Sequence, residues 1–202
     1  MGIKEYLARH LLLADGAMGT QIQLRQPGAA AWGKYEGCNE WLNLSAPEII
    51  RDIHAAYFAA SSDAVETNSF GASPITLGEY GLAEKTREIS HAAAQIARGA
   101  AVAAATKDGR PRFVLGSVGP GTKLATLGQV SFDDLYGGCQ EQMGGLLEGG
   151  ADGIIVETCQ DLLQIKAAVA AAMQVLGSRS DKLLYVSVTV ETTGTLLVGS
   201  SI

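Results

Sequence analysis

Short apolar runs alternate along this chain with longer segments whose apolar residues recur at helical spacing. The runs predict strands at residues 11–14, 64–65, 113–118, 153–156 and 183–190. The longer segments predict helices at about residues 3–10, 45–60, 82–105, 131–147 and 161–176. Alternating strands and helices indicate an α/β fold with parallel strands joined by right-handed crossovers.

Local signals refine several of these elements. Ser45 to Glu48 has the pattern of a capping box, and Ser131 and Asp161 are expected to cap the helices that follow them. The strand at 183–190 is largely apolar, as expected for a strand covered on both faces. The inward face of the last helix is expected to consist of Leu162, Ile165, Val169, Met173 and Leu176.

Polar and glycine residues gather where the predicted strands end, whereas the segments before the strands resemble plain turns. This one-sided distribution is typical of a (β/α)8 TIM barrel, whose chemistry lies at the C-terminal face of its strands. A doubly wound sheet is the alternative, with its site at a single switch point. A complete barrel needs about 250 residues. We therefore expect residues 1–202 to be the N-terminal part of one barrel domain, with about five of the eight βα units.

Charge and composition narrow the functional class. The net charge is −6 and there is no basic run, which argues against binding to nucleic acid or to an anionic membrane. The Ala-rich segment at 92–105 contains Gln95 and Arg98, so it is a poor membrane span. The N-terminus is a poor signal peptide. A cytoplasmic enzyme, or a piece of one, is the expected class.

Two of the strand ends carry candidate chemistry. Glu157 follows an apolar strand, and a carboxylate there is costly unless it meets a partner or a ligand. The segment from Asp15 to Thr20 has glycines that allow close approach of a ligand and backbone N–H groups that can hold an anion. An ordinary turn with a capping Asp explains this segment equally well. The irregular segment at 25–40 predicts a long loop, which is more often functional than not.

Six motifs occur together and in order, and they resemble one family. They are Asp15-Gly-Ala-Met-Gly-Thr20, Glu36-Gly-Cys-Asn-Glu40, Val65-Glu-Thr-Asn-Ser-Phe-Gly71, Gly116-Ser-Val-Gly-Pro-Gly-Thr122, Val156-Glu-Thr-Cys-Gln-Asp161 and Val188-Thr-Val-Glu-Thr-Thr-Gly194. The resemblance is to the homocysteine S-methyltransferase domain at the N-terminus of cobalamin-dependent methionine synthases. It covers residues 11–202 and implies a (β/α)8 barrel that binds homocysteine.

The resemblance also implies roles for individual residues. Asp15 and Glu157 correspond to the carboxylates that hold the substrate ammonium, an arrangement suited to a buried cation. The backbone of Gly16, Ala17, Met18, Gly19 and Thr20 corresponds to the segment that receives the substrate carboxylate. Thr67 and Asn68 would line the floor of the pocket.

In the family, the homocysteine thiolate is bound to zinc and attacks the methyl group of methylcobalamin. One partner domain binds cobalamin, and another, the pterin domain, binds methyltetrahydrofolate. The zinc ligands are three cysteines, in parts of the domain that we expect beyond Ile202. Cys38, Cys139 and Cys159 do not match those positions and do not have zinc-finger spacing, so no metal ligand is assigned here. We expect tight binding of neither zinc nor methylcobalamin by these residues alone.

Two alternatives remain open from the sequence. The first is an inactive partial barrel that binds substrate weakly or pairs with another chain, because an open sheet exposes its edges. The second is a Schiff-base aldolase that uses Lys123 or Lys166 as its amine nucleophile.

Overall fold

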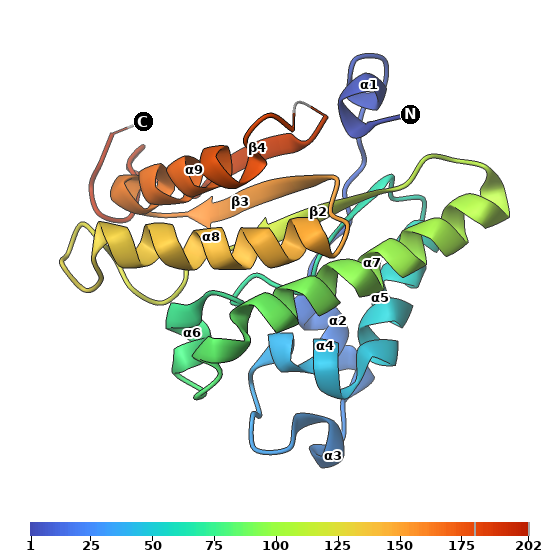
Figure 1. The fold of residues 1–202 in the computed structure, drawn as a ribbon, viewed down its shortest axis with the longest axis horizontal. Helices are drawn as coiled ribbons and strands as arrows, with labels where there is room; N and C mark the ends of the chain where they lie inside the picture. Colours follow the sequence, from blue (N-terminus) through green and yellow to red (C-terminus); the bar gives the residue numbers. More distant parts are fainter. Residues whose placement is uncertain (180, 202) are drawn as a thin grey trace.

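The centre of the molecule is a four-stranded parallel sheet (Figure 1). A computed structural model describes residues 1–179 and 181–201. The strands pair in sequence order, and every pair is parallel. They are β1 (Ala64–Glu66), β2 (Phe113–Val118), β3 (Gly153–Cys159) and β4 (Leu183–Val188).

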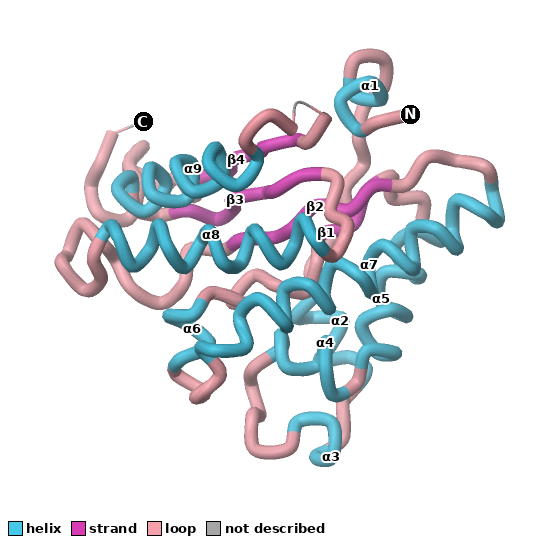
Figure 2. Tube along the Cα trace, in the orientation of Figure 1, coloured by secondary structure: helices cyan, strands magenta, loops and turns pink. Residues whose placement is uncertain are grey.

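Four long helices pack against one another beside the sheet, and shorter ones lie before α5 and between β1 and α7 in the chain (Figure 2). The long helices are α5 (Pro47–Ala59), α7 (Thr86–Asp108), α8 (Phe132–Glu148) and α9 (Leu162–Leu176). The short α-helices are α1 (Ile3–Leu7), α2 (Met18–Arg25), α3 (Ala29–Trp32), α4 (Leu42–Ser45) and α6 (Pro74–Gly78). Two 3₁₀ turns complete the set, η1 (Asn39–Trp41) and η2 (Ala83–Lys85).

The strand order confirms the barrel-type α/β prediction. A doubly wound sheet reverses its strand order at a switch point. Here each strand instead lies next to its sequence neighbour, and α5, α7, α8 and α9 pack side by side in the same order. Within the described residues, β1 and β4 each pair with a strand on one side only. The sheet is therefore an open segment of a barrel wall.

The predicted strand at 11–14 does not form, so four of the five expected strands are present in the described residues. This segment still meets the start of β1. The carbonyl oxygen of Leu13 accepts hydrogen bonds from the N–H groups of Asp63 and Ala64, at 2.7 and 3.2 Å. The N–H of Leu13 donates to the Asp63 carboxylate at 3.0 Å. A side chain thus takes the place of a strand partner, and no regular ladder extends along the segment.

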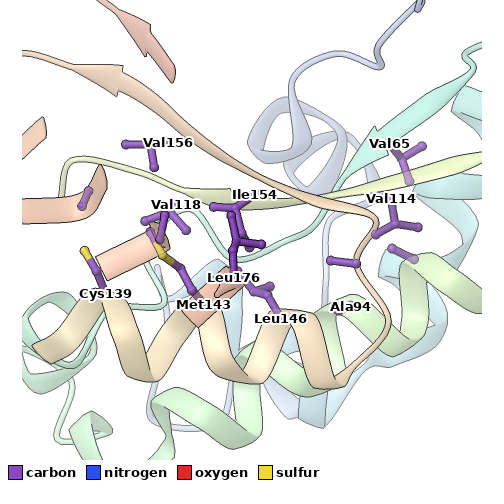
Figure 3. Packing of buried hydrophobic residues seen from close by; sticks show 14 of the residues in the cluster. Val65, Ala94, Val114, Val118, Cys139, Met143, Leu146, Ile154, Val156 and Leu176 are labelled. Carbon is purple, nitrogen blue, oxygen red and sulfur yellow. The ribbon is translucent and has the colours of Figure 1, made fainter. Parts of the chain in front are cut away.

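Side-chain alternation along the strands separates an outer from an inner face. The outer face packs against the helices and forms the main core (Figure 3). Its members include Val114, Val118, Ile154 and Val156 of the sheet and Met143, Leu146 and Leu176 of the helices. Close packing extends between the helices as well. A Cβ atom at Gly145 of α8 would lie 2.7 Å from the carbonyl oxygen of Arg87 on α7.

The inner face is apolar only near the strand starts. Phe113, Leu115 and Ile155 pack there with Ile3 of α1, which lies at this end of the sheet. Further along the same faces, the inward positions become Ser117 on β2 and Glu157 on β3. Because side chains on a strand alternate between the two faces, the inner face is apolar near the strand starts and polar near the strand ends.

The structure corrects two of these local details. Ser45 does not cap α5: its hydroxyl donates to Trp41, and Ala46 occupies the N-cap position. β4 is not covered on both faces, since Tyr185 is 53% exposed. In contrast, Ser131 and Asp161 do cap α8 and α9, as predicted.

The inward face of α9 also differs from the prediction. It consists mainly of small residues, Ala167, Ala168, Ala171 and Ala172, which let α9 approach α8 and the sheet closely. Leu162 and Met173 lie outside this strip and are 42% and 63% exposed. Only Leu176 of the five predicted residues is buried. The spacing of apolar residues alone could not show that the alanines face inward and that the larger apolar residues lie beside them.

Two methionines provide a matched test of this core. Met143 is fully buried on α8, whereas Met173 is 63% exposed on α9. We expect Met143→Ala to lower the free energy of unfolding by about 2–5 kcal/mol, because it leaves a cavity among well-packed neighbours. Met173→Ala should change it by less than about 0.5 kcal/mol. Urea denaturation followed by circular dichroism measures both values, and equal losses would contradict the assigned burial.

Candidate functional site

A cavity of about 490 Å³ opens at the C-terminal ends of β1, β2 and β3. Glu66, Ser117 and Glu157 face it from the three neighbouring strands. The remaining lining comes from the loop that follows β1 and from the N-terminal third, namely Gly16, Ala17, Met18, Gly19, Thr20, Asn39, Glu40, Thr67, Asn68, Ser69 and Phe70. Seven of the eight predicted site residues therefore meet at one cavity, and the eighth, Asp15, lies beside it.

Glu157 lies at an irregularity of β3. The register between β3 and β4 shifts between Val156 and Cys159, and Thr158 adopts a φ of 57°. Bulges of this kind re-aim side chains next to functional sites. Glu157 Oε1 accepts a hydrogen bond from the Ser117 hydroxyl at 2.5 Å. Burial raises the pKa of Glu157, and the Ser117 hydrogen bond partly offsets that effect.

Asp15 binds the edge of β1 through its carboxylate. Its two oxygens accept the backbone N–H of Glu66 at 3.1 and 3.2 Å, where a neighbouring strand would otherwise pair. Burial, reinforced by the charge of Glu66, raises the pKa of Asp15 to about 8. Asp15 is not among the residues that line the cavity. Its observed contact is therefore a structural one that positions the end of β1.

Glu66 is a functional candidate that the sequence analysis did not assign. Its side chain is half-buried and lines the cavity. Burial, followed by the charge of Glu157, raises the pKa of Glu66 to about 7. Glu66 could have been identified from its place at the end of a strand, which is the feature that identified Glu157. Pairing of β1 with β2 and of β2 with β3 brings the two glutamates to one cavity.

The segment from Gly16 to Thr20 leads into α2, which begins at Met18. The N-cap residue is Ala17, and no side chain caps this helix. Backbone N–H groups in the first turn of a helix lack intrahelical partners and favour anions. Tyr57 of α5 supports the segment by donating its hydroxyl to the Ala17 carbonyl oxygen at 3.2 Å. The segment is therefore placed to present N–H groups at the cavity.

Thr67 and Asn68 line the cavity, and hydrogen bonds hold both side chains in place. The Ser69 hydroxyl donates to the carbonyl oxygen of Ser117 at 2.7 Å, so the 2.6 Å contact between Thr67 and Ser69 uses the Thr67 proton. Thr67 also accepts the Ser117 N–H at 3.0 Å. The Asn68 amide donates to the Asn39 carbonyl oxygen and to Asn43 Oδ1. These bonds hold this part of the cavity lining in place.

The segment predicted as a long loop contributes the side wall. It contains α3 and η1, and its end places Asn39 and Glu40 at the cavity. Glu40 Oε1 accepts the N–H of Gly71 at 2.7 Å, which ties the loop to the segment after β1. A Cβ atom at Gly71 would lie 2.9 Å from this oxygen, so a larger residue would shift the Glu40 carboxylate.

The cysteines of the described chain do not form a metal centre. Cys38 packs with Ala72 and Leu77, whereas Cys139 and Cys159 belong to the main core. Burial raises the pKa of these thiols to about 11 for Cys38 and Cys159 and about 12 for Cys139, which disfavours the thiolate that a metal needs. Within residues 1–179 and 181–201, no group of three or more His, Cys, Asp or Glu residues could hold a metal ion. The residues present do not fit zinc.

The two lysines considered for aldolase chemistry lie away from this cavity. Lys123 is exposed and approaches Glu79 at 3.7 Å, and Lys166 is exposed on α9. Neither lines the cavity between β1, β2 and β3. Among the described helices, none is long and apolar enough to cross a bilayer.

Comparisons with known proteins identify a matching family. Residues 12–202 match the family described as homocysteine S-methyltransferase. The chain is 46% identical to methionine synthase of Mycobacterium leprae (strain TN) and 45% identical to that of Mycobacterium tuberculosis (strain ATCC 25618 / H37Rv), over 199 residues in each case. These 199 residues are 98% of this chain, but only 16% and 17% of those two relatives.

Solved structures show the same fold. The metallated homocysteine methyltransferase MmuM from Escherichia coli matches with a TM-score of 0.79 at 23% identity, over 98% of this chain and 70% of that one. Its apo form matches with a TM-score of 0.70, over 96% of this chain and 66% of that one. The fold is therefore shared, and the family match over residues 12–202 shows that the chain belongs to the homocysteine S-methyltransferase family.

Proposed function

We propose that this chain supplies the amino-acid-binding part of a methionine synthase, in which homocysteine accepts a methyl group on its thiol. The observation that carries the proposal is the cavity at the strand ends. Carboxylates line one side of it, and a helix start without a side-chain cap lies at another. An α-amino acid carries a cation and an anion on one carbon, so it complements both features. The 46% identity to a methionine synthase supports the same assignment.

In this proposal the carboxylate cluster holds the substrate ammonium. Glu157 lines the cavity and Asp15 adjoins it, and both are the residues expected for this role. The substrate carboxylate lies against the N–H groups of Gly16, Ala17, Gly19 and Thr20. Thr67 and Asn68 form the floor. Orientation by both charged groups directs the side-chain thiol toward the open part of the cavity.

Only the family resemblance supports the methyl donor and the metal in this proposal. Zinc, when bound, lowers the pKa of a thiol and so supplies a thiolate at neutral pH. The described residues do not fit zinc, and we assign no step to it in this chain. Methylcobalamin is the proposed donor, with cobalamin-binding and methyltetrahydrofolate-binding pterin domains as partners in the cytoplasm.

One alternative has a specific observation in its favour. The exposed side chains of β4 and its single paired edge fit a partial barrel that pairs with another chain. The Schiff-base alternative lacks such support, because Lys123 and Lys166 do not line the cavity.

Removing the charge of Glu157 tests the ammonium role. We expect Glu157→Gln to weaken homocysteine binding at least about tenfold, because one charge-assisted hydrogen bond is lost. Isothermal titration calorimetry under reducing conditions measures the dissociation constants. Glu84→Gln is the matched control, since Glu84 is exposed on η2 and should leave binding unchanged. Equal affinities for the Glu157→Gln variant and the unmodified chain would rule out this role.

The pH dependence of binding follows from the raised pKa values. Asp15, at about 8, and Glu66, at about 7, are largely protonated below these values. A bound ammonium favours the ionised carboxylates, so affinity should rise from pH 6 to pH 8 as the protons become easier to release. Methionine is the suitable ligand, because it has no thiol that titrates.

Calorimetry at pH 7 in two buffers of different ionisation enthalpy counts the released protons. We expect net release by the unmodified chain and reduced release by the double variant Asp15→Asn/Glu66→Gln. Affinity that is constant from pH 6 to pH 8, without proton release, would contradict the prediction.

A further inference from the structure

We propose that a second, much smaller cavity holds one ordered water molecule, which joins Gln142 of α8 to Gln164 of α9. This α8–α9 cavity has a volume of about 20 Å³ and lies between the two helices and the loop that follows β2. One internal water needs about 10–15 Å³ of such space. The α8–α9 cavity shares no lining residue with the larger cavity at the strand ends, so the proposal does not depend on the identity of the substrate.

Backbone acceptors determine the orientation of the Gln142 amide. Its Nε2 donates to the carbonyl oxygens of Ser69 at 2.7 Å and of Ser117 at 3.3 Å. A reversed amide would place Oε1 against these two oxygens, so Oε1 must point away from them. The side chain lines the α8–α9 cavity and is 1% exposed. Within residues 1–179 and 181–201, its Oε1 has no hydrogen-bond donor.

Gln164 has the same arrangement on α9. Its Nε2 donates to the carbonyl oxygen of Pro120, which determines the orientation of this amide as well. The side chain is 5% exposed at the same cavity, and no donor among the described residues reaches its Oε1. A buried amide oxygen without a donor is unfavourable. Two such acceptors at one small cavity are satisfied by a molecule that has two donor hydrogens.

Cys139 supplies a third group for a water molecule. It lies three positions before Gln142, on the same side of α8, and lines the α8–α9 cavity. Burial, followed by the charge of Cys159, raises the pKa of Cys139 to about 12, so its thiol keeps a proton to donate at neutral pH. A water that donates to both glutamines and accepts from Cys139 makes about three hydrogen bonds, the usual number for a buried water.

Other occupants fit this chemistry less well. A divalent cation takes about six or more oxygen ligands. The lining of the α8–α9 cavity instead includes Lys123 and contains no Asp or Glu. An organic molecule is too large for a volume of about 20 Å³. A single water matches the size, the neutral charge and the two acceptors.

This water connects α9 to the backbone of the cavity at the strand ends. Ser69 and Ser117 line that cavity, and Gln142 binds the carbonyl oxygens of both. Gln142 and Gln164 share no hydrogen bond within the described residues. Their connection therefore passes through the water, which stabilises the position of Gln142 behind the strand ends.

A crystal structure of the full chain, at a resolution that shows ordered water, tests the site directly. We expect one water within hydrogen-bonding distance of Oε1 of Gln142 and Oε1 of Gln164, with the Cys139 thiol as its third partner. The proposal fails if no water lies there or if the water bonds only one glutamine. It also fails if the two amides rotate to pair with each other, or if a metal ion occupies the position.

A double-mutant cycle tests the connection in solution. Gln142→Met and Gln164→Met each remove one acceptor, and urea denaturation gives the unfolding equilibrium constant of each variant and of the double variant. We expect the combined effect to differ from the product of the single effects by more than about twofold, because the two residues share one water. Additive effects, within about twofold, would overturn the connection between α8 and α9.

Gln140→Met replaces Gln142→Met in the control cycle. Gln140 also lies on α8, but its amide donates to the Tyr136 hydroxyl and it does not line the α8–α9 cavity. Its effect should add to that of Gln164→Met within about twofold. If a variant does not fold, the crystal structure of the unmodified chain still decides the proposal.

Discussion

The structure depends on the burial of one face of a parallel sheet beneath a row of helices. Because α7, α8 and α9 cover the outer face, Val114, Val118, Ile154 and Val156 must point outward. Every alternate residue then points inward. Near the strand starts these are apolar and pack on α1, and at the strand ends they are Ser117 and the two glutamates. The packing that stabilises the fold thus also determines the direction of the side chains at the site.

The inward glutamates are costly to the unliganded protein. Burial raises the pKa values of all three carboxyl groups, and the charge of a neighbouring carboxylate adds to the effect at Asp15 and Glu66, which reach about 8 and about 7. Hydrogen bonds hold the surroundings rigid, through Thr67, Ser69 and Ser117 below and through Glu40 at the side. A rigid cavity of like charges cannot relax by moving these charges apart. Such a cavity favours a cationic group over an anionic one.

Local patterns were sufficient for the elements that have strong local causes. Ser131 and Asp161 cap helices because their side chains reach N–H groups in the next turn. The strand at 11–14 was predicted from its apolar run, but the Asp63 carboxylate occupies the N–H that a ladder needs. On α9 the bulky residues lie beside the strip of alanines, because close approach to α8 favours small side chains. Such outcomes depend on neighbours that are distant in the sequence.

The sequence by itself determined the α/β alternation, the position of chemistry at the strand ends and the role of Glu157 as a candidate. Each follows from spacing along a short segment. Only the tertiary structure separated the roles of the carboxylates. Asp15 and Glu66 are 51 positions apart, and their relation exists because one carboxylate accepts a backbone N–H at the edge of β1. Pairing of β1 with β2 and of β2 with β3 then brings Glu66 and Glu157 to one cavity, and the strand register is set by packing across the whole sheet.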